Sequence, residues 1–559
     1  MSFPKPSECV AGDEALARGA WVDARSAFEH ALSNRETPEA LEGLGIAAWW
    51  LDLADLVFDS RERAYRLYLG QGDHARAARV AVWLAWDSWA FRGEHAVANG
   101  WLQRARRLLE HHPACAERAW LEIRESALCL LEEGDPERAL MLGNEGIRIA
   151  QEAGSVDFEM LGRAVVGMAL VVSGSLAAGM RNLDEVNAAV IAGEVTDRVA
   201  IGLCGCYLIA ACERVRDYER ALQWCRRLKE FCAKWGIRPL FAVCRTQYAS
   251  ICLWRGTWAE AEQELCAASD ELAASRPAMK GEALVRMAEL RRRQGRLAEA
   301  QALVEQVPPH GAGLLERARL AQDRDEPRSA LEFVEQLLRH LPALNCTDRA
   351  ACLELTVRAR TDLHDWPAAK AALDQLEAIS GKLATVPLRA DFSFASGYFA
   401  LGQGKAEEAR HCLEAACDAY TRSGAPFETA RTRVQLARAL GALGRIDAAI
   451  EQINQGKVLL SDLNAELEAA RAEKVFADLL ALQAAGASSA ARPKTGDLSK
   501  REIEILRLVA QGLSNQSIAE RLFVSDHTVH RHIANILNKL DVSTRAAAVA
   551  QAARRGLLT

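Results

Sequence analysis

The sequence lacks several features that mark common classes of protein. Aromatic residues make up only 6% of its 559 residues. Its 15 cysteines are odd in number and include no C-x-x-C pair, which excludes a disulfide scaffold and is typical of reduced thiols in a cytoplasmic protein. The longest uncharged stretch, residues 164–180, contains three glycines. We interpret it as two helix ends rather than a membrane span.

The motifs of common catalytic and metal-binding sites are missing too. The phosphate-binding pattern G-x-x-x-x-G-K-[ST] is absent, because the Gly-Lys pairs at Gly381, Gly404 and Gly456 lack the earlier glycine and the following hydroxyl. The patterns H-E-x-x-H and G-x-S-x-G do not occur either. We therefore predict no catalytic residue, no metal and no cofactor. The start, MSFPKPSECV, lacks the basic and apolar regions of a signal peptide, so we expect a cytoplasmic, nucleoid-associated protein.

What the sequence does contain favours a large helical protein. Half of the residues are hydrophobic, and alanine, leucine, glutamate and arginine, which lose little side-chain freedom on a helix, are frequent. The net charge of −6 is unevenly spread. Residues 494–559 hold 10 basic and 6 acidic residues, whereas the rest of the chain holds 59 and 69. A basic C-terminal segment on an acidic body indicates that a polyanion would bind at the C-terminus.

A short sequence motif recurs along most of the chain. A turn residue, often glycine, is followed by polar residues and then, five positions on, by alanine, as in Gly134-Asp135-Pro136-Glu137-Arg138-Ala139. The copies at Asp52 and Gly174 are degenerate. The spacing between copies is 30 to 42 residues and mostly close to 40. Such a period predicts helix pairs that stack into a superhelical solenoid. The twelve copies begin at Gly19, Asp52, Gly93, Gly134, Gly174, Arg216, Gly256, Gly295, Asp325, His364, Gly404 and Gly444.

These motifs resemble tetratricopeptide repeats. Their longer period is similar to that of the helix-pair repeats in the sensor region of the bacterial maltose regulator. The resemblance implies an all-α fold with a superhelix of about twelve repeats over residues 12–483. It also implies a sensor or interaction role for that region, without the nucleotide-binding module of the maltose regulator. Residues 484–497, rich in small residues, predict a linker.

Aromatic residues concentrate in the first half of the repeats. Trp83, Trp86 and Trp89 follow one another at three-residue steps, and Arg245 and Tyr248 share a face of one predicted helix. This pattern predicts a cavity that holds an anionic or phenolic ligand inside an aromatic wall. The alternative is that the tryptophans fill gaps between helices and that Arg245 pairs with a carboxylate. The predicted ligand-binding residues are Trp83, Trp86, Tyr207, Arg245 and Tyr248.

Dense helix-capping signals mark residues 498–559. Ser499 and Glu502 have the spacing of a capping box and predict a first helix to about Gln511. Three further serines predict the starts of a second helix, a third that runs to Leu540, and a fourth that ends near Gly556. These serines are Ser514, Ser525 and Ser543.

The predicted third helix has two unlike faces. Its apolar side is formed by Val529, Ile533, Ile536, Leu537 and Leu540. Its outer side carries His527, Arg531, Ala534 and Asn538, with His530 and Asn535 at the edges. A short helix, a tight turn and a helix with a polar outer face form a helix-turn-helix, whose outer face fits the major groove of DNA.

Residues 496–558 resemble the DNA-binding domain of LuxR/GerE-type regulators. The shared pattern is L-x-x-R-E-x-x-x-L-x-x-x-A-x-G, then S-N-x-x-I-A-x-x-L, then V-S-x-x-T-V, His532 and Lys539-Leu540. The resemblance implies a four-helix domain over residues 498–559 that binds double-stranded DNA as a homodimer. It further implies an activator that contacts RNA polymerase.

The resemblance also implies roles for single residues. Residues 526–540 correspond to the recognition helix, in which Arg531 is predicted to read a guanine edge. His530 stands where the family commonly has lysine, so it would be a weaker, pH-sensitive contact. Hydroxyl and amide side chains at helix starts are expected to meet phosphates. The predicted DNA-binding residues are Ser514, Asn515, Ser525, His527, Thr528, His530, Arg531, Ala534, Asn535, Asn538, Lys539 and Arg545.

Three functional interpretations follow. In the first, a one-component transcription regulator senses a small effector in its superhelix. In the second, the superhelix docks a partner protein that controls the DNA-binding domain. The third, an enzyme with an unrecognised site in the aromatic groove, needs a catalytic constellation that the sequence does not display. A closed cavity near Arg245 and Tyr248 would favour the first, and an open groove with exposed apolar patches the second.

Overall fold

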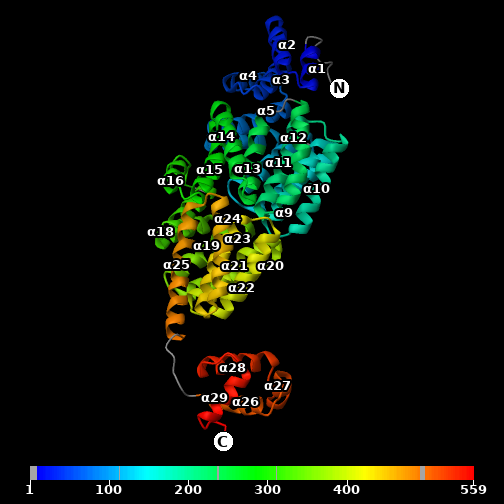
Figure 1. Ribbon diagram of the computed structural model, residues 1–559. Helices are drawn as coiled ribbons and strands as arrows, with labels where there is room; N and C mark the ends of the chain where they lie inside the picture. Colours follow the sequence, from blue (N-terminus) through cyan, green and yellow to red (C-terminus); the bar gives the residue numbers. More distant parts are fainter. Residues whose placement is uncertain (1–8, 113, 236–237, 310, 491–497, 559) are drawn as a thin grey trace. The chain divides into compact units, whose positions relative to one another are not determined.

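The computed structural model is all helical in the residues that it describes, which are 9–112, 114–235, 238–309, 311–490 and 498–558 (Figure 1). The all-α prediction is thereby confirmed. Contacts divide the chain into two units, residues 1–476 and 477–559. Across these described ranges, no helix has both the length and the apolar character that a membrane span requires.

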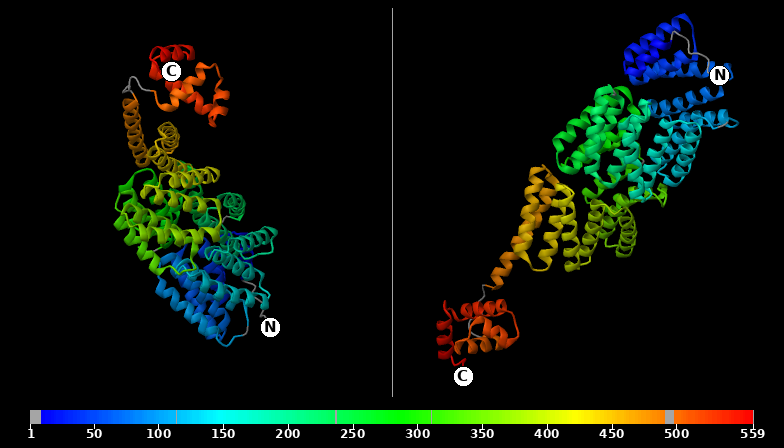
Figure 2. Two further views of the ribbon diagram at one scale, coloured as in Figure 1. Left: turned by 90° about the horizontal axis from the view of Figure 1, so that it is seen from below. Right: turned by 90° about the vertical axis from the view of Figure 1, so that its right-hand side faces the viewer.

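The first unit consists of consecutive helix pairs, which the views from two further sides also display (Figure 2). Its first six pairs are α1 (Val10–Arg18) and α2 (Trp21–Asn34), α3 (Pro38–Trp50) and α4 (Ala54–Gly70), α5 (His74–Asp87, continued by the π-helical turn η2, Ser88–Arg92) and α6 (His95–Leu109), α7 (Ala116–Leu131) and α8 (Pro136–Glu152), α9 (Val156–Val172) and α10 (Leu176–Ala192), and α11 (Arg198–Val215) and α12 (Tyr218–Trp235).

Six more pairs and a single helix complete this series. They are α13 (Arg238–Arg255) and α14 (Trp258–Ser275), then after the 3-10 turn η3 (Pro277–Met279) α15 (Lys280–Arg293) and α16 (Leu297–Glu305), α17 (Gly311–Asp323) and α18 (Pro327–His340), α19 (Cys346–Asp362) and α20 (Trp366–Leu383), α21 (Val386–Gly402) and α22 (Ala406–Arg422), and α23 (Pro426–Ala442) and α24 (Ile446–Asp462). The helix α25 (Glu466–Ala490) follows.

All twelve predicted turn residues adopt the left-handed backbone conformation, with φ from 56° at Asp52 to 95° at Gly174. Each one joins the two helices of a pair, as Gly134 does for α7 and α8. Glycine tolerates this conformation without strain, and a short polar residue such as Asp52 tolerates it better than most others. The predicted register of twelve helix pairs is therefore confirmed.

After eleven of the twelve turns, the residue five positions on is alanine or glycine, and this small residue lets the paired helices approach closely. Ala139 in α8 and Ala409 in α22 are fully buried. At the corresponding place in α10, a Cβ on Gly179 would lie 2.5 Å from the backbone oxygen of Gly167 in α9. A larger side chain would force such a pair apart, because helix packing leaves no free volume at the contact.

Hydrogen bonds also tie repeats that are far apart in sequence. Side chains at the starts of α19, α21 and α25 donate to carbonyl groups at the ends of α7, α9, α11 and α17, which the helices themselves leave unpaired. The residues so joined are 148 to 211 positions apart. Successive turns of the superhelix therefore contact each other. The pairs are Asn345 with Gly134, Cys346 with Ser173, Thr385 with Val215, and Arg471 with Asp323.

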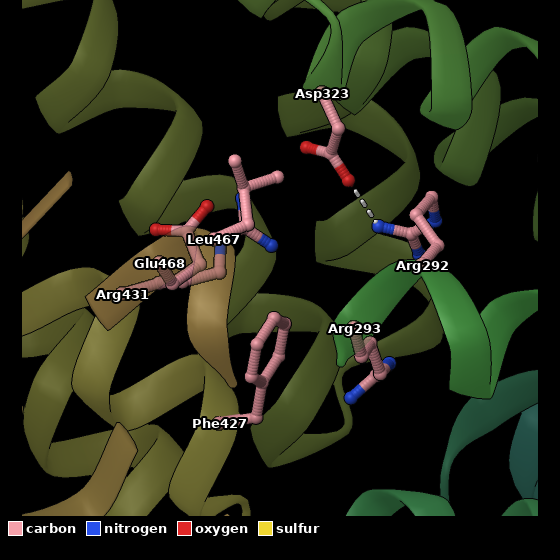
Figure 3. Close-up of a pocket in the computed structure, with 7 residues that line it drawn as sticks. All are labelled: Arg292, Arg293, Asp323, Phe427, Arg431, Leu467 and Glu468. Carbon is pink, nitrogen blue, oxygen red and sulfur yellow. Dashed lines mark hydrogen bonds and ion pairs between the residues drawn. The ribbon is translucent and has the colours of Figure 1, made fainter. Parts of the chain in front are cut away.

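A compact ionic cluster lies where α15, α17, α23 and α25 meet (Figure 3). The guanidinium of Arg292 donates to Asp323 at 2.7 Å and to Glu316 at 2.6 Å. Phe427 packs beside Arg293, whose guanidinium carbon lies 4.9 Å from the ring centroid. The space between these side chains is about 10 Å³, which suits a single water molecule. The cluster is thus a compensated contact between superhelical turns.

The second unit has its own hydrophobic core, formed by apolar residues of α26 (Lys500–Ala510), α27 (Asn515–Leu522), α28 (Asp526–Leu540) and α29 (Arg545–Arg554). The predicted linker, residues 484–497, begins inside α25, which runs on to Ala490 because alanine is the strongest helix former. Residues 491–497 lie outside the described part of the chain.

Candidate nucleic-acid interface and effector site

The first three helices of the second unit start at the predicted caps. Ser499 accepts the Glu502 N–H at 3.2 Å, and Glu502 accepts the Ser499 N–H at 2.7 Å, which completes the capping box. Ser514 and Ser525 cap α27 and α28. The predicted cap of the fourth helix is wrong by one residue, because the neighbouring hydroxyl of Thr544 accepts the Ala547 N–H at 3.2 Å.

Helix α28 has the two faces that the sequence predicts. Val529, Ile533, Ile536 and Leu540 are buried in the core of the unit, with Leu537 half-buried beside them. The opposite face is exposed to solvent. Its described exposed residues are His530, Arg531, Ala534, Asn535 and Asn538, while the side chain of His527 lies outside the described residues.

The hydroxyl groups at the two helix starts are held in place by local bonds. Ser514 accepts the Ser517 N–H and Ser525 accepts the Thr528 N–H, each at 3.2 Å. The Ser525 and Thr528 hydroxyls lie 2.7 Å apart. Ser514 and Ser525 are exposed, so a phosphate could reach the N-termini of α27 and α28, where backbone N–H groups and the helix dipole favour an anion.

Two of the predicted DNA-contacting cations are engaged within the unit itself. Lys539 donates to Glu502 at 2.7 Å, which ties α28 to α26. Arg545 donates to the side chain of Asn515 and to the carbonyl of Leu513, both at 2.9 Å, and so joins α29 to the start of α27. These contacts give both cations a structural role that the sequence did not predict, because their partners are distant in the chain. Their contact with DNA stays a prediction.

The turn of the helix-turn-helix contains a residue that no sequence motif marks. Phe523, between α27 and α28, has φ +52° and is 94% exposed. The left-handed conformation ends α27 and lets Val524 pack against the core. It also directs the aromatic side chain outwards.

The predicted effector residues fall into two groups in the first unit. Arg245 on α13 donates to Glu264 at 3.1 Å, and the Tyr248 hydroxyl donates to Glu260 at 2.9 Å. Both partners lie on α14, so the two residues do share a face, as predicted. That face points to the neighbouring helix α14. The ion pair of Arg245 is the alternative that the sequence left open.

The second group surrounds a residue that sequence reasoning missed. Trp83 and Trp86 of α5 lie beside Trp120 and Arg124 of α7, and Tyr207 of α11 interacts with Arg124. Trp120 and Arg124 are four residues apart, and this helical spacing is the signal that could have identified them. Within the described residues, no group of His, Cys, Asp and Glu side chains could hold a metal ion.

The second unit, which has these caps, its own core and an exposed face on α28, is a helix-turn-helix domain. The first unit, which precedes it in the chain, is a series of helix pairs. Residues 497–552 match the bacterial regulatory proteins of the luxR family. The chain therefore carries a LuxR-type helix-turn-helix domain, as the sequence pattern predicted.

Two bacterial regulators match this chain over 61 residues each, and the chain covers less than a third of either of them. The transcriptional regulatory protein LiaR of Bacillus subtilis is 52% identical over 61 residues, which are 11% of this chain and 29% of LiaR. A putative HTH-type transcriptional regulator of Mycobacterium bovis is 48% identical over 61 residues, 11% of this chain and 7% of that protein. The crystal structure of the APC/C hetero-tetramer Cut9-Hcn1 aligns with 85% of this chain and 93% of that chain, at 14% identity and a TM-score of 0.46.

Proposed function

We propose that the protein is a transcriptional regulator whose second unit binds double-stranded promoter DNA. The observation that carries this proposal is the division of α28 into a buried apolar face and an exposed polar face. In a helix-turn-helix, such an exposed face enters the major groove. The regulatory proteins that share the domain support the same function.

The exposed residues divide into two kinds of DNA contact. Arg531 offers paired N–H donors to the acceptor edge of guanine, and Asn535 and Asn538 can pair with adenine. Ser514 and Ser525 stand at helix N-termini, where they fix the position of the domain on phosphates. His530 adds a contact that depends on its protonation. Specificity would thus come from α28 and affinity largely from the phosphate contacts.

The test is DNA binding by the full chain and by the fragment 490–559, on the upstream region of its own gene over a series of salt concentrations. We expect both to bind a discrete site, with an affinity that falls as salt rises because phosphate contacts release counterions. Binding by the fragment alone would make the repeat region an inhibitor. Absence of a discrete site for both would contradict the proposal.

Replacing Arg531 by alanine tests the base contact directly. We expect Arg531→Ala to lose about 1–3 kcal/mol of specific binding and to relax the base preference at one position of the site. Arg554→Ala, which removes an exposed cation from the far end of α29, is the matched control and should keep the base preference. Unchanged affinity and base preference in Arg531→Ala would remove this residue from the interface.

For the repeat region we propose the sensing of a small effector that changes how the second unit binds DNA. Such an effector must bind one conformation of the protein better than another, otherwise it shifts nothing. The alternative is that the repeat region binds a partner protein. A surface groove of about 680 Å³ between α10 and α12 favours a partner protein, because exposed Ile191 and half-buried Trp224 lie there among charged residues. Isothermal titration with small molecules tests the effector. A pull-down that compares the wild type with Trp224→Ala tests the partner protein, because the variant should lose a partner that binds in this groove.

Homodimerisation on DNA and contact with RNA polymerase complete the proposal. Ala546, Ala550 and Ala553 are exposed on α29, and small side chains allow two such helices to pack closely. Sedimentation of the full chain with and without its DNA site gives the oligomeric state. A single copy on the site would contradict the dimer. Transcription in vitro from that promoter, with purified polymerase, tests activation.

A further inference from the structure

Among the residues of the first unit whose burial is described, six arginines are buried, and one of them differs from the rest. Arg124 on α7 is 3% exposed and has no carboxylate partner among the residues that the structure describes. Burying an unpaired cation is costly, so a protein keeps one where something else compensates it. The carboxylate partners of the other five are Asp87 for Arg61, Asp52 for Arg276, Glu262 for Arg291, Glu316 for Arg292 and Glu289 for Arg293.

The groups around Arg124 are hydrogen-bond donors. Its guanidinium carbon lies 3.5 Å from the ring centroid of Trp86 and 5.4 Å from that of Trp120. The indole N–H groups of both tryptophans are buried and have no acceptor in the described part of the chain. The Tyr207 side chain is 4% exposed and interacts with the guanidinium. Among the described residues, no carboxylate accompanies this group of donors.

The electrostatic balance indicates the charge of that acceptor. Burial lowers the pKa of Arg124 to about 10, and the Tyr207 oxygen opposes this only in part. The group therefore still carries one positive charge at neutral pH. One unit of negative charge would neutralise it, whereas a doubly charged phosphate would leave a second charge in an apolar site.

The surroundings of the site indicate the rest of the ligand. Trp83 lies 5.5 Å from Trp120 and Trp89 lies 5.5 Å from Trp86, measured between ring centroids, and Phe158 stacks on Trp120. Trp83, Trp86 and Trp89 are half-buried, so this aromatic group extends from Arg124 to the surface. Its rings offer an apolar wall to an aromatic or aliphatic body.

We propose that Arg124, Trp86, Trp120 and Tyr207 form a binding site for a small organic monocarboxylate with an apolar body. A guanidinium can stack its face on an aromatic ring and still bind a carboxylate in bidentate fashion through its N–H edge. The indole and phenol donors complete the pairing. That this ligand is the effector rests on the proposed function, whereas the binding itself does not.

A stability comparison tests the uncompensated charge without any ligand. Arg124→Met and Arg61→Met both remove a buried guanidinium that stacks on a tryptophan, and only Arg61 has a carboxylate partner, Asp87. We expect full-length Arg124→Met to unfold at the temperature of the wild type or above it, because a buried unpaired charge is removed. Arg61→Met should unfold at a lower temperature, because buried Asp87 loses its ion-pair partner.

A titration then tests the ligand. Phenylacetate, added to the full chain while tryptophan fluorescence is followed, should bind in a saturable manner, and phenylacetamide should bind at least about tenfold more weakly because it lacks the charge. Hexanoate extends the test to an aliphatic body. Arg124→Met should abolish the response, and Arg124→Lys should retain part of it.

Two results would overturn the proposal. One is an Arg124→Met protein that is destabilised as much as Arg61→Met, which would mean that the charge is compensated within the fold. The other is a fluorescence response that is absent at millimolar carboxylate, or that is equal for acid and amide. DNA binding measured on the same preparations keeps this outcome separate from a failure of the proposed regulator function.

Discussion

At the scale of single residues, Glu502 connects two interactions that hold the DNA-binding unit together. It accepts the Ser499 N–H at the start of α26 and the ammonium group of Lys539 from α28, both at 2.7 Å. Burial opposes its charge. The bonds from Lys539 and Ser499 outweigh that effect, so that the pKa of Glu502 lies below its ordinary value of 4.5. The carboxylate thus fixes one end of the recognition helix.

We therefore expect Glu502→Gln to lower the free energy of unfolding of the second unit by about 1–2 kcal/mol at neutral pH. Because the folded pKa is depressed, this stabilisation is present above pH 4.5 and is lost as the pH falls through the folded pKa. The difference between wild type and variant should therefore shrink in acid. Urea unfolding of residues 490–559, followed by circular dichroism, measures it.

A neighbouring carboxylate on the same helix serves as the control. Glu504 pairs with Arg501 at 2.7 Å, and its side chain is 51% exposed. An exposed pair of this kind contributes little, so Glu504→Gln should cost less than about 0.5 kcal/mol. Equal losses in the two variants would show that the connection between α26 and α28 does not stabilise the unit.

At the scale of helices, the turns of the repeats are not equivalent. Gly256, between α13 and α14, has φ +80°, and a Cβ there would lie 2.7 Å from both Leu463 and Pro426 of a later superhelical turn. Gly404, between α21 and α22, has a similar φ of +76° and nothing within 4 Å of a Cβ. A substitution at either position causes the same backbone strain, but only one at Gly256 also disturbs a contact between repeats.

We expect Gly404→Ala to cost about 1 kcal/mol, the strain of a left-handed alanine. Gly256→Ala adds a clash to the same strain, so its loss should be clearly larger and its melting temperature lower. Thermal unfolding of the full chain, followed by circular dichroism, compares the two. Equal losses of stability in the two variants would mean that Leu463 and Pro426 move aside at no cost, so that this contact between superhelical turns does not contribute to stability.

At the scale of the whole molecule, the two units have separate hydrophobic cores. Calorimetry should therefore resolve two transitions. The smaller, from some sixty residues, should absorb about 40 kcal/mol near 60 °C at about 0.7 kcal/mol per residue. Glu502→Gln should shift only the smaller transition and Gly256→Ala only the larger. A single cooperative transition that both variants shift would show that the units depend on each other to fold.

Local signals made much of this architecture predictable. Eleven of the twelve turn residues lie five positions before an alanine or a glycine, and the capping box of Ser499 and Glu502 lies within one helical turn. Both patterns act through neighbours in the chain, and the structure has them where the sequence predicts. The sequence predicts the cap of α29 at Ser543, whereas Thr544 caps it, because two adjacent hydroxyl residues offer the same cap.

The candidate effector site could be predicted only in part, because its residues come from separate helices. The sequence indicated Trp83, Trp86 and Tyr207, which the fold brings together, but also Arg245, which pairs with Glu264 on another helix. Arg124 could not be predicted, because a buried cation indicates a binding site only when the groups around it are known. Those groups come from other helices and are brought together by the tertiary structure.

The sequence by itself determined the helix-pair register, the caps of the terminal unit and the polar face of α28, because each depends on residues within one or two helical turns. Only the tertiary structure decided which charges are compensated. It paired Lys539 with Glu502 and Arg61 with Asp87, and it left Arg124 among tryptophans. Burial and long-range pairing set the free energy of a charge, and superhelical turns join residues that lie 148 to 211 positions apart.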